Sequence, residues 1–251
     1  MAALRVEQAG DTLRVTMDRA DRRNAFDADL IRELTEAFAD VGDARAVVLA
    51  GEGESFSAGA DVDWMRASIQ LSYEENVADA RRLRMMLDAI NTCPAPVIAR
   101  VQGHALGGGC GLVACSDVVV AAPDAVFAFS EVKLGIIPSV ISPFALAKIG
   151  ESAARRYFLT GERFDAQTAF RIGLVHELAA ELDAGVERIV AELRTAGPEA
   201  ARHAKQLVLE RPDSLGTERR IAQRRTSDEG QEGLRAFLEK RKPAWSSENS
   251  S

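Results

Sequence analysis

Three consecutive glycines, Gly107-Gly108-Gly109, separate a strand-like run at 96–101 from an apolar, helix-like run at 112–115. Glycines in such a turn indicate that the backbone comes close to another group or adopts positive φ angles. The first amides of the following helix have no intrahelical partner, and the helix dipole attracts negative charge to that end. We therefore expect the turn either to hold an anion or developing oxyanion, or simply to pack a helix tightly on a strand.

The order of hydrophobic patterns predicts an α/β fold. Strands are expected at 13–17, 46–50, 97–101 and 118–121, and helices at 27–38 and 73–90. Such alternation favours parallel strands with right-handed crossovers. Beyond about residue 152 helical patterns dominate, except for a strand-like run at 174–178. We therefore divide the chain into a core, 1–191, and a helical C-terminal region, 192–251, which serves either oligomerisation or capping of its own core.

Composition excludes several classes of function. The net charge of −7 argues against general affinity for nucleic acid or an anionic membrane. No apolar run reaches transmembrane length, and the N-terminus has no signal-peptide pattern. Cys93, Cys110 and Cys115 lack zinc-site spacing, and the three histidines form no metal motif. We expect a cytoplasmic protein with free thiols and no metal site.

A second loop resembles the glycine turn in its position and its small residues. It spans 54–61, is rich in serine, alanine and glycine, and follows the predicted 46–50 strand. In a parallel sheet the loops at the carboxyl ends of neighbouring strands line one crevice. Small residues in both loops would allow two backbone N–H groups to converge on one oxygen. Such an oxyanion hole suits a thioester carbonyl that becomes an enolate.

Glu131 is the candidate acid or base. It lies in a largely apolar stretch, 127–138, and apolar surroundings raise the pKa of a carboxyl group toward the range useful for proton transfer. The alternative interpretation is a salt bridge to Lys133, or a surface position at the end of a strand.

Two other motifs are near matches. The run Gly109-Cys110-Gly111-Leu112-Val113-Ala114 fits a dinucleotide fingerprint, but its first glycine is too far from the preceding strand. The run 55–59, centred on Ser57, resembles a nucleophile elbow without its first glycine, and no histidine is well placed to serve it.

Six segments taken together resemble the crotonase, or enoyl-CoA hydratase/isomerase, superfamily along nearly the whole chain. They are 23–26, 56–61, 103–110, Asp117, 130–138 and 237–242. The resemblance implies a spiral of ββα units with a helical C-terminal region that builds homotrimers, often paired into homohexamers. It also implies an acyl-coenzyme A ligand. Coenzyme A is then part of the substrate, and no separate cofactor is expected.

The resemblance also implies site residues. The amides of Ala60 and Gly108 would form the oxyanion hole, and Glu131 would be the catalytic acid–base. The coenzyme and substrate would contact Arg23, Ala25, Ala58, Ala60, Asp61, Val62 and Gly108. Arg23 would lie near the phosphates. Phe237 and Lys240 would reach the coenzyme from the C-terminal region, commonly that of a neighbouring subunit.

One departure from the family pattern concerns catalysis. Typical hydratases hold water between two glutamates; the second matches Glu131, and Gly111 stands in place of the first. Either Glu131 and backbone groups handle water alone, or the enzyme is an isomerase that moves a proton without water. A non-catalytic acyl-CoA-binding protein is a third reading, since binding needs the loops but not Glu131.

A further similarity favours hydration. The segments 107–116, 130–138, 141–143 and 153–160 are similar to the bacterial methylglutaconyl-CoA hydratase-like group, which also carries glycine at that position. Residues 138–142 replace the usual Pro-Gly-x-Gly-Gly, so a reshaped acyl pocket is expected. We therefore predict an enoyl-CoA hydratase-type lyase for methylglutaconyl-CoA or a related branched substrate. Gly111 is expected to leave room for water or for a bulky or carboxylated acyl chain.

Overall fold

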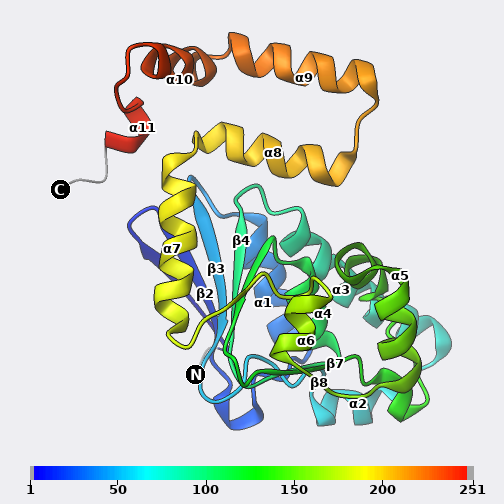
Figure 1. The fold of residues 1–251 in the computed structure, drawn as a ribbon. Coiled ribbons are helices and arrows are strands. Elements are labelled where there is room, and N and C mark those ends of the chain that lie inside the picture. Colours follow the sequence, from blue (N-terminus) through cyan, green and yellow to red (C-terminus); the bar gives the residue numbers. More distant parts are fainter. Residues whose placement is uncertain (1–2, 248–251) are drawn as a thin grey trace.

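The computed structural model describes residues 3–247 and contains one large and one small sheet in that part of the chain (Figure 1). The large sheet has the order β1-β2-β3-β4-β6-β9, with β1 antiparallel to β2 and the other neighbours parallel. Its strands are β1 (Leu4–Ala9), β2 (Thr12–Met17), β3 (Ala46–Gly51), β4 (Val97–Val101), β6 (Val118–Ala121) and β9 (Glu177–Leu178). The small sheet comprises β5 (His104–Leu106), β7 (Val126–Ala128) and β8 (Phe164–Asp165).

Helices connect and cover these strands. In the core they are α1 (Ala28–Ala39), α2 (Val62–Ser68), α3 (Tyr73–Asn91), α4 (Gly108–Cys115), α5 (Ser142–Thr160), α6 (Ala166–Arg171) and α7 (Leu182–Thr195). The C-terminal helices are α8 (Pro198–Glu210), α9 (Ser214–Thr226), α10 (Asp228–Leu238) and α11 (Ala244–Ser247). None of the helices within 3–247 combines the length and apolar character that a membrane crossing requires.

The predicted helix starts have clear local causes. Asp27 caps α1 by accepting a hydrogen bond from the Leu30 amide at 3.0 Å. At α3 the Ser72 hydroxyl accepts from the Glu75 amide, and the Glu75 carboxylate accepts from the Ser72 amide, which is a reciprocal capping box. The helices predicted at 27–38 and 73–90 are thus confirmed.

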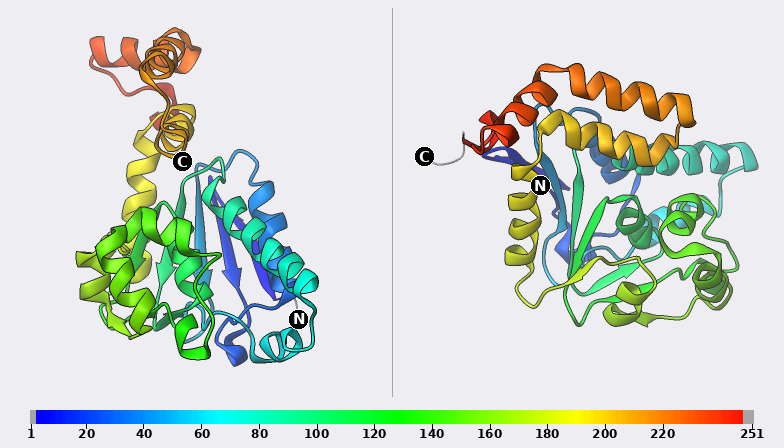
Figure 2. Two further views of the ribbon diagram at one scale, coloured as in Figure 1. Left: turned by 90° about the vertical axis from the view of Figure 1, so that its right-hand side faces the viewer. Right: turned by 45° about the horizontal axis from the view of Figure 1, so that its top comes forward.

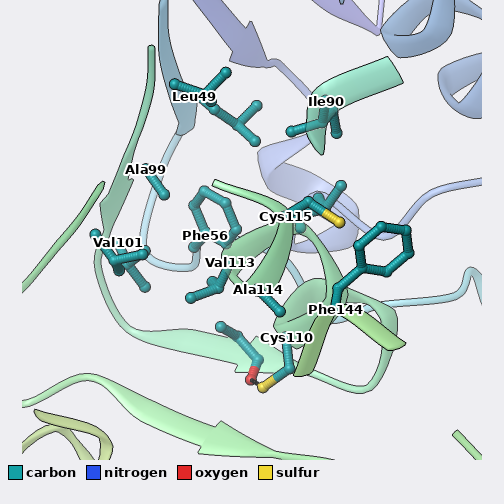
Figure 3. Packing of buried hydrophobic residues seen from close by; sticks show 14 of the residues in the cluster. Leu49, Phe56, Ile90, Ala99, Val101, Cys110, Val113, Ala114, Cys115 and Phe144 are labelled. Atoms are coloured by element: carbon teal, nitrogen blue, oxygen red, sulfur yellow. Dashed lines mark hydrogen bonds between the residues drawn. The ribbon is translucent and has the colours of Figure 1, made fainter. Parts of the chain in front are cut away.

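Both faces of the large sheet are covered, which explains its continuous apolar strands. Along β3, Val47 and Leu49 join the main core with α1, α3 and α4, whereas Val48 packs against α7 on the opposite face (Figures 1 and 2). This alternation follows the two-residue period of a strand. Figure 3 shows side chains of α4, including Val113 and Cys115, in the middle of the main core.

The sequence did not predict the small sheet. Its strands are two or three residues long, too short for a hydrophobic period to show. The predicted strand at 174–178 is also shorter in the structure, where only Glu177–Leu178 pairs with β6. The helix after the glycine turn begins at Gly108, so Gly109 and Gly111 lie inside α4 and not before it.

The C-terminal helices project away from the core (Figure 2). Residue 192, the expected start of this region, lies within α7, and the chain leaves the sheet only at α8. A polar tie anchors α8: Lys205 Nζ lies 2.7 Å from Asp117 Oδ2, which also accepts a hydrogen bond from the Val97 amide. The Lys205 side chain is 7% exposed and that of Asp117 is 28% exposed, so the cation is shielded from water and the carboxylate is partly shielded.

We expect Lys205→Met to lower the free energy of unfolding by about 2 kcal/mol, because it leaves a half-buried carboxylate without its cation. Urea denaturation would measure the loss. The exposed Lys242→Met serves as the control and should change the free energy by less than ~0.5 kcal/mol. Equal stability of the two variants would show that the tie to Asp117 does not stabilise the fold.

Candidate active site

A pocket of about 250 Å³ lies between α2, α3, the glycine turn and the segment 136–141. Ala60, Gly108 and Glu131 all line it, so the structure brings together the three residues predicted for the oxyanion hole and the acid–base. Most of the remaining wall is apolar and includes Trp64 and Leu83. The loops that follow β3 and β4 therefore meet at one end of the sheet, as the parallel arrangement predicts.

Backbone pairing holds the two loops together. Ser57 pairs with Ala105 of β5 in a parallel bridge, and Phe26 pairs with Ala60 in another. The Phe26 amide donates to the Gly59 carbonyl at 2.8 Å, and the Asp61 amide donates to the Phe26 carbonyl at 3.0 Å. The loop 54–61 is thus held by isolated bridges between the segment at Phe26 and the small sheet.

Two amides at the pocket have no protein partner. Within residues 3–247, neither the Ala60 N–H nor the Gly108 N–H donates a hydrogen bond. The amides on either side of Ala60 are used, since that of Gly59 donates to Ser57 Oγ at 3.2 Å and that of Asp61 donates to the Phe26 carbonyl. The Gly107 amide donates to the Ala128 carbonyl at 2.8 Å. Gly108 is also the first residue of α4, where the helix dipole adds positive potential. The two free donors can stabilise negative charge on one bound oxygen.

Glycine is required where the loops touch. Gly59 has φ +86°, and a Cβ there would lie 2.5 Å from the Leu106 carbonyl oxygen. A Cβ on Gly108 would lie 2.3 Å from Cζ of Phe26. A side chain at Gly59 would push the two loops apart, and one at Gly108 would clash with the buried Phe26 ring.

The Glu131 carboxyl group faces the glycine turn. A Cβ placed on Gly107 would lie 3.4 Å from Glu131 Oε1, and Oε2 is buried without a hydrogen-bond partner in the described part of the chain. Burial raises the pKa of Glu131, outweighing the hydrogen bond from its own backbone amide that lowers it. The alternative salt bridge is wrong, because Lys133 is exposed and makes no ion pair with Glu131 in residues 3–247.

Gly111 does not line the pocket; it is buried inside α4. A Cβ on Gly111 would lie 2.5 Å from Cγ2 of Ile141, a residue that is 2% exposed and does line the pocket. The expectation that Gly111 leaves room for water or a bulky acyl chain is therefore wrong. The space that a side chain at 111 would need is filled by Ile141.

Some residues predicted to contact the coenzyme are exposed and able to bind a ligand, whereas others are buried or already hydrogen-bonded within the protein. Arg23 is exposed, and in residues 3–247 its guanidinium makes no hydrogen bond or ion pair; its carbonyl accepts from the Ala58 amide at 2.9 Å. Val62 is 64% exposed, whereas Ala25 is buried.

The Asp61 carboxylate already has partners within the protein. It caps α2, and its Oδ2 lies 2.9 Å from a guanidinium nitrogen of Arg22. Although burial raises its pKa, the hydrogen bonds from Arg22 and from the Asp63 amide outweigh it, and the pKa lies below its ordinary value. The side chain of Asp61 therefore positions the loop. Its backbone is used as well, since the amide donates to the Phe26 carbonyl and the carbonyl accepts from the Met65 amide at 2.9 Å.

Phe237 and Lys240 are not brought to the pocket within one chain. Both are exposed, Phe237 at 80%, and α10 stands beyond α8 on the side of the molecule away from α2 (Figure 1).

The two near-match motifs do not form sites. A Cβ on Gly109 would lie 2.6 Å from the Ser57 carbonyl oxygen, so a pyrophosphate has no space against this part of α4. Ser57 is fully buried, and its hydroxyl donates to the Asn24 carbonyl at 2.9 Å. It holds the loop in place and is not a nucleophile.

A sequence model of the enoyl-CoA hydratase/isomerase family matches residues 7–248. The chain belongs to this family. A putative enoyl-CoA hydratase of Thermus thermophilus is 34% identical over 250 residues, covering 94% of this chain and 98% of the relative. A probable enoyl-CoA hydratase of Mycobacterium tuberculosis is 34% identical over 207 residues, covering 81% of each chain.

Solved structures of the family agree with the fold. The crystal structure of an enoyl-CoA hydratase from Shewanella pealeana has a TM-score of 0.92 at 40% identity, covering 97% of this chain and 96% of that one. Pseudomonas aeruginosa AtuE has a TM-score of 0.91 at 37% identity, covering 97% and 99%. The predicted crotonase fold is thus confirmed, and the chain is an enzyme of the crotonase superfamily.

Sequence reasoning missed one wall of this crotonase pocket. Asn76, Asp79, Ala80 and Leu83 of α3 line it. Their spacing of i, i+3, i+4 and i+7 places them on one helix face. That face mixes polar and apolar residues, so the hydrophobic pattern alone did not single it out.

We expect Glu131→Gln to raise the melting temperature at pH 7–8. The raised pKa means that the folded state holds this proton more tightly than the unfolded state, so the carboxyl costs stability as pH rises through the folded pKa. Below the unfolded pKa of about 4.3 the carboxyl is neutral in both states and the advantage of glutamine should vanish. Melting curves from pH 4 to 8 measure this, and a constant difference across that range would contradict it.

We expect Gly111→Ala to lower the free energy of unfolding by roughly 1–3 kcal/mol, because the added methyl meets Ile141. In an Ile141→Ala background the same change should be neutral or stabilising by up to ~1 kcal/mol, since alanine is the better helix former. A double-mutant cycle by urea denaturation measures the coupling. Additive effects would mean that Ile141 is not what excludes a side chain at 111.

Proposed function

We propose that this enzyme is an enoyl-CoA hydratase, a lyase that adds water reversibly across the 2,3 double bond of an acyl-CoA thioester. The observation that carries the proposal is the meeting, in one apolar pocket, of a carboxyl group with a raised pKa and two unpartnered amides. The names of the relatives reported above support the same activity.

The proposed mechanism uses the amides and the carboxyl in turn. The thioester oxygen accepts hydrogen bonds from the Ala60 and Gly108 amides, which draws electrons from C3. The Glu131 carboxylate takes a proton from water as the water oxygen bonds to C3, and the electron pair moves to the thioester oxygen as an enolate. The resulting Glu131 acid returns a proton to C2 as the enolate collapses. The amides bind the enolate more strongly than the neutral thioester, and that difference accelerates the reaction.

Binding of the coenzyme is proposed to involve more than one chain. The guanidinium of Arg23, which has no partner within residues 3–247, is available to the phosphates, beside Ala25, Ala58 and Val62. Phe237 and Lys240 reach the coenzyme when supplied by a neighbouring subunit. Exposed apolar residues along α8–α10 support a homotrimer or homohexamer; they include Val208 at 71%, Ile221 at 51% and Leu238 at 77%.

An enoyl-CoA isomerase is the second candidate, and the occupation of the Gly111 site by Ile141 favours it. With a single glutamate beside the two amides, Glu131 can take a proton from C2 of a 3-enoyl thioester, which forms a dienolate whose oxygen the amides bind. Return of that proton to C4 leaves the double bond between C2 and C3, and no water is needed. The apolar wall supports an acyl group with a bulky or branched chain in either reaction.

We expect Glu131→Gln to reduce hydration of crotonyl-CoA by about 10²–10⁴-fold, because an amide cannot accept the proton from water. The loss of absorbance of the 2-enoyl thioester measures the rate. Glu151→Gln, an exposed change on α5, is the control and should keep the wild-type rate.

The other outcomes decide between the candidates. A wild-type rate of hydration by Glu131→Gln would show that Glu131 does not take part in the reaction. Conversion of 3-enoyl to 2-enoyl thioesters without hydration would establish the isomerase. Coenzyme A binding without turnover of any enoyl thioester would establish a binding protein.

A further inference from the structure

The charged residues of the pocket wall are all acidic. Among the residues that line it in the described chain, only Glu131 and Asp79 carry charge, and no lysine, arginine or histidine is present. Glu131 belongs to the proposed chemistry, whereas Asp79 stands on α3, in the wall formed by that helix. The proposed mechanism assigns no step to Asp79.

Asp79 is largely withdrawn from water and only partly compensated. Its side chain is 14% exposed, and Oδ1 accepts a hydrogen bond from Arg82 at 3.1 Å. The Arg82 side chain is 61% exposed and lines a different groove, against α1. The Arg82 guanidinium therefore neutralises part of the negative charge of Asp79 but lies outside the pocket. It cannot contact a ligand bound within the pocket.

The neutral polar side chains of the pocket are partly used, and the Trp64 indole N–H and the Ser139 hydroxyl donate no hydrogen bond within residues 3–247. The Asn76 side-chain amide donates to the carbonyls of Leu71 and Ser72, and the Ser68 hydroxyl donates to the Met65 carbonyl at 2.7 Å. Ser139 contributes one further hydroxyl, which is neutral. An acyl chain that ends in a carboxylate would thus lose its water shell without gaining a cation, and would face a like charge.

We propose that Asp79 is a specificity-determining residue that selects neutral, apolar acyl chains and rejects those with a second carboxylate. This inference rests on the proposed function, since it assigns the pocket to the acyl chain of an enoyl thioester. It revises the expected substrate from methylglutaconyl-CoA to a neutral branched 2-enoyl thioester of similar size.

A matched pair of substrates tests the proposal. 3-Methylcrotonyl-CoA and 3-methylglutaconyl-CoA differ only by the terminal carboxylate. The wild-type enzyme should favour the neutral member by about 100-fold in kcat/KM, and Asp79→Asn should narrow that ratio about tenfold. Asp88→Asn makes the same change on the same helix outside the pocket and should leave the ratio unaltered.

Binding of saturated analogues separates the proposal from the proposed reaction. Isovaleryl-CoA and 3-methylglutaryl-CoA cannot be hydrated, and calorimetry gives their affinities whether or not the enzyme is a hydratase. The role of Asp79 is supported if the wild-type enzyme binds the neutral analogue more tightly and Asp79→Asn reduces the difference in affinity between the two analogues. Tighter binding of the carboxylated analogue would overturn the role of Asp79. The same ratio of affinities for the two analogues in Asp79→Asn and Asp88→Asn would also overturn it. Absence of hydration of every enoyl thioester, with that binding preference intact, would overturn the hydratase alone.

Discussion

The direct backbone contact between the loop 54–61 and the glycine turn is the constraint on which the site depends. Parallel bridges join Ser57 to Ala105 and Ala60 to Phe26, and Gly59 and Gly108 allow approaches that any Cβ would block. The amides of Gly59, Asp61 and Gly107 donate within the protein, whereas those of Ala60 and Gly108 have no partner among residues 3–247. A rigid pair of donors needs no reorganisation when an oxygen becomes negative, which is the basis of its proposed catalytic value.

The same packing creates a cost at Glu131. Its carboxyl group sits against the glycine turn with one buried oxygen unpartnered, and burial raises its pKa. An unpaired polar group in an apolar pocket destabilises the folded state but is suited to exchanging protons with a substrate. Stability and proton transfer are therefore opposed at this one residue, and the capped helices and the Lys205–Asp117 tie stabilise the fold elsewhere.

The shape and charge of the pocket come from residues outside the catalytic loops. Ile141 fills the space that a longer residue at 111 would need, so Gly111 and Ile141 form one packing unit. Another part of the wall is a face of α3, where Asp79 places a negative charge beside apolar neighbours. The proposed selectivity for the acyl group is thus separable from the proposed oxyanion hole, since the two depend on different helices and segments.

The sequence by itself determined the buried strands 97–101 and 118–121, the capped helices and the order of α/β elements, because these depend on short-range periodicity and local hydrogen bonds. Family motifs also marked Ala60, Gly108 and Glu131 before their positions were known. Only the tertiary structure decided that the amides of Ala60 and Gly108 have no partner within residues 3–247, that Ile141 occupies the space beside Gly111, and that Asp79 lines the pocket. The small sheet and the spatial separation of Phe237 and Lys240 from the pocket were also decided there. These features arise from contacts between segments distant in sequence, which no local pattern encodes.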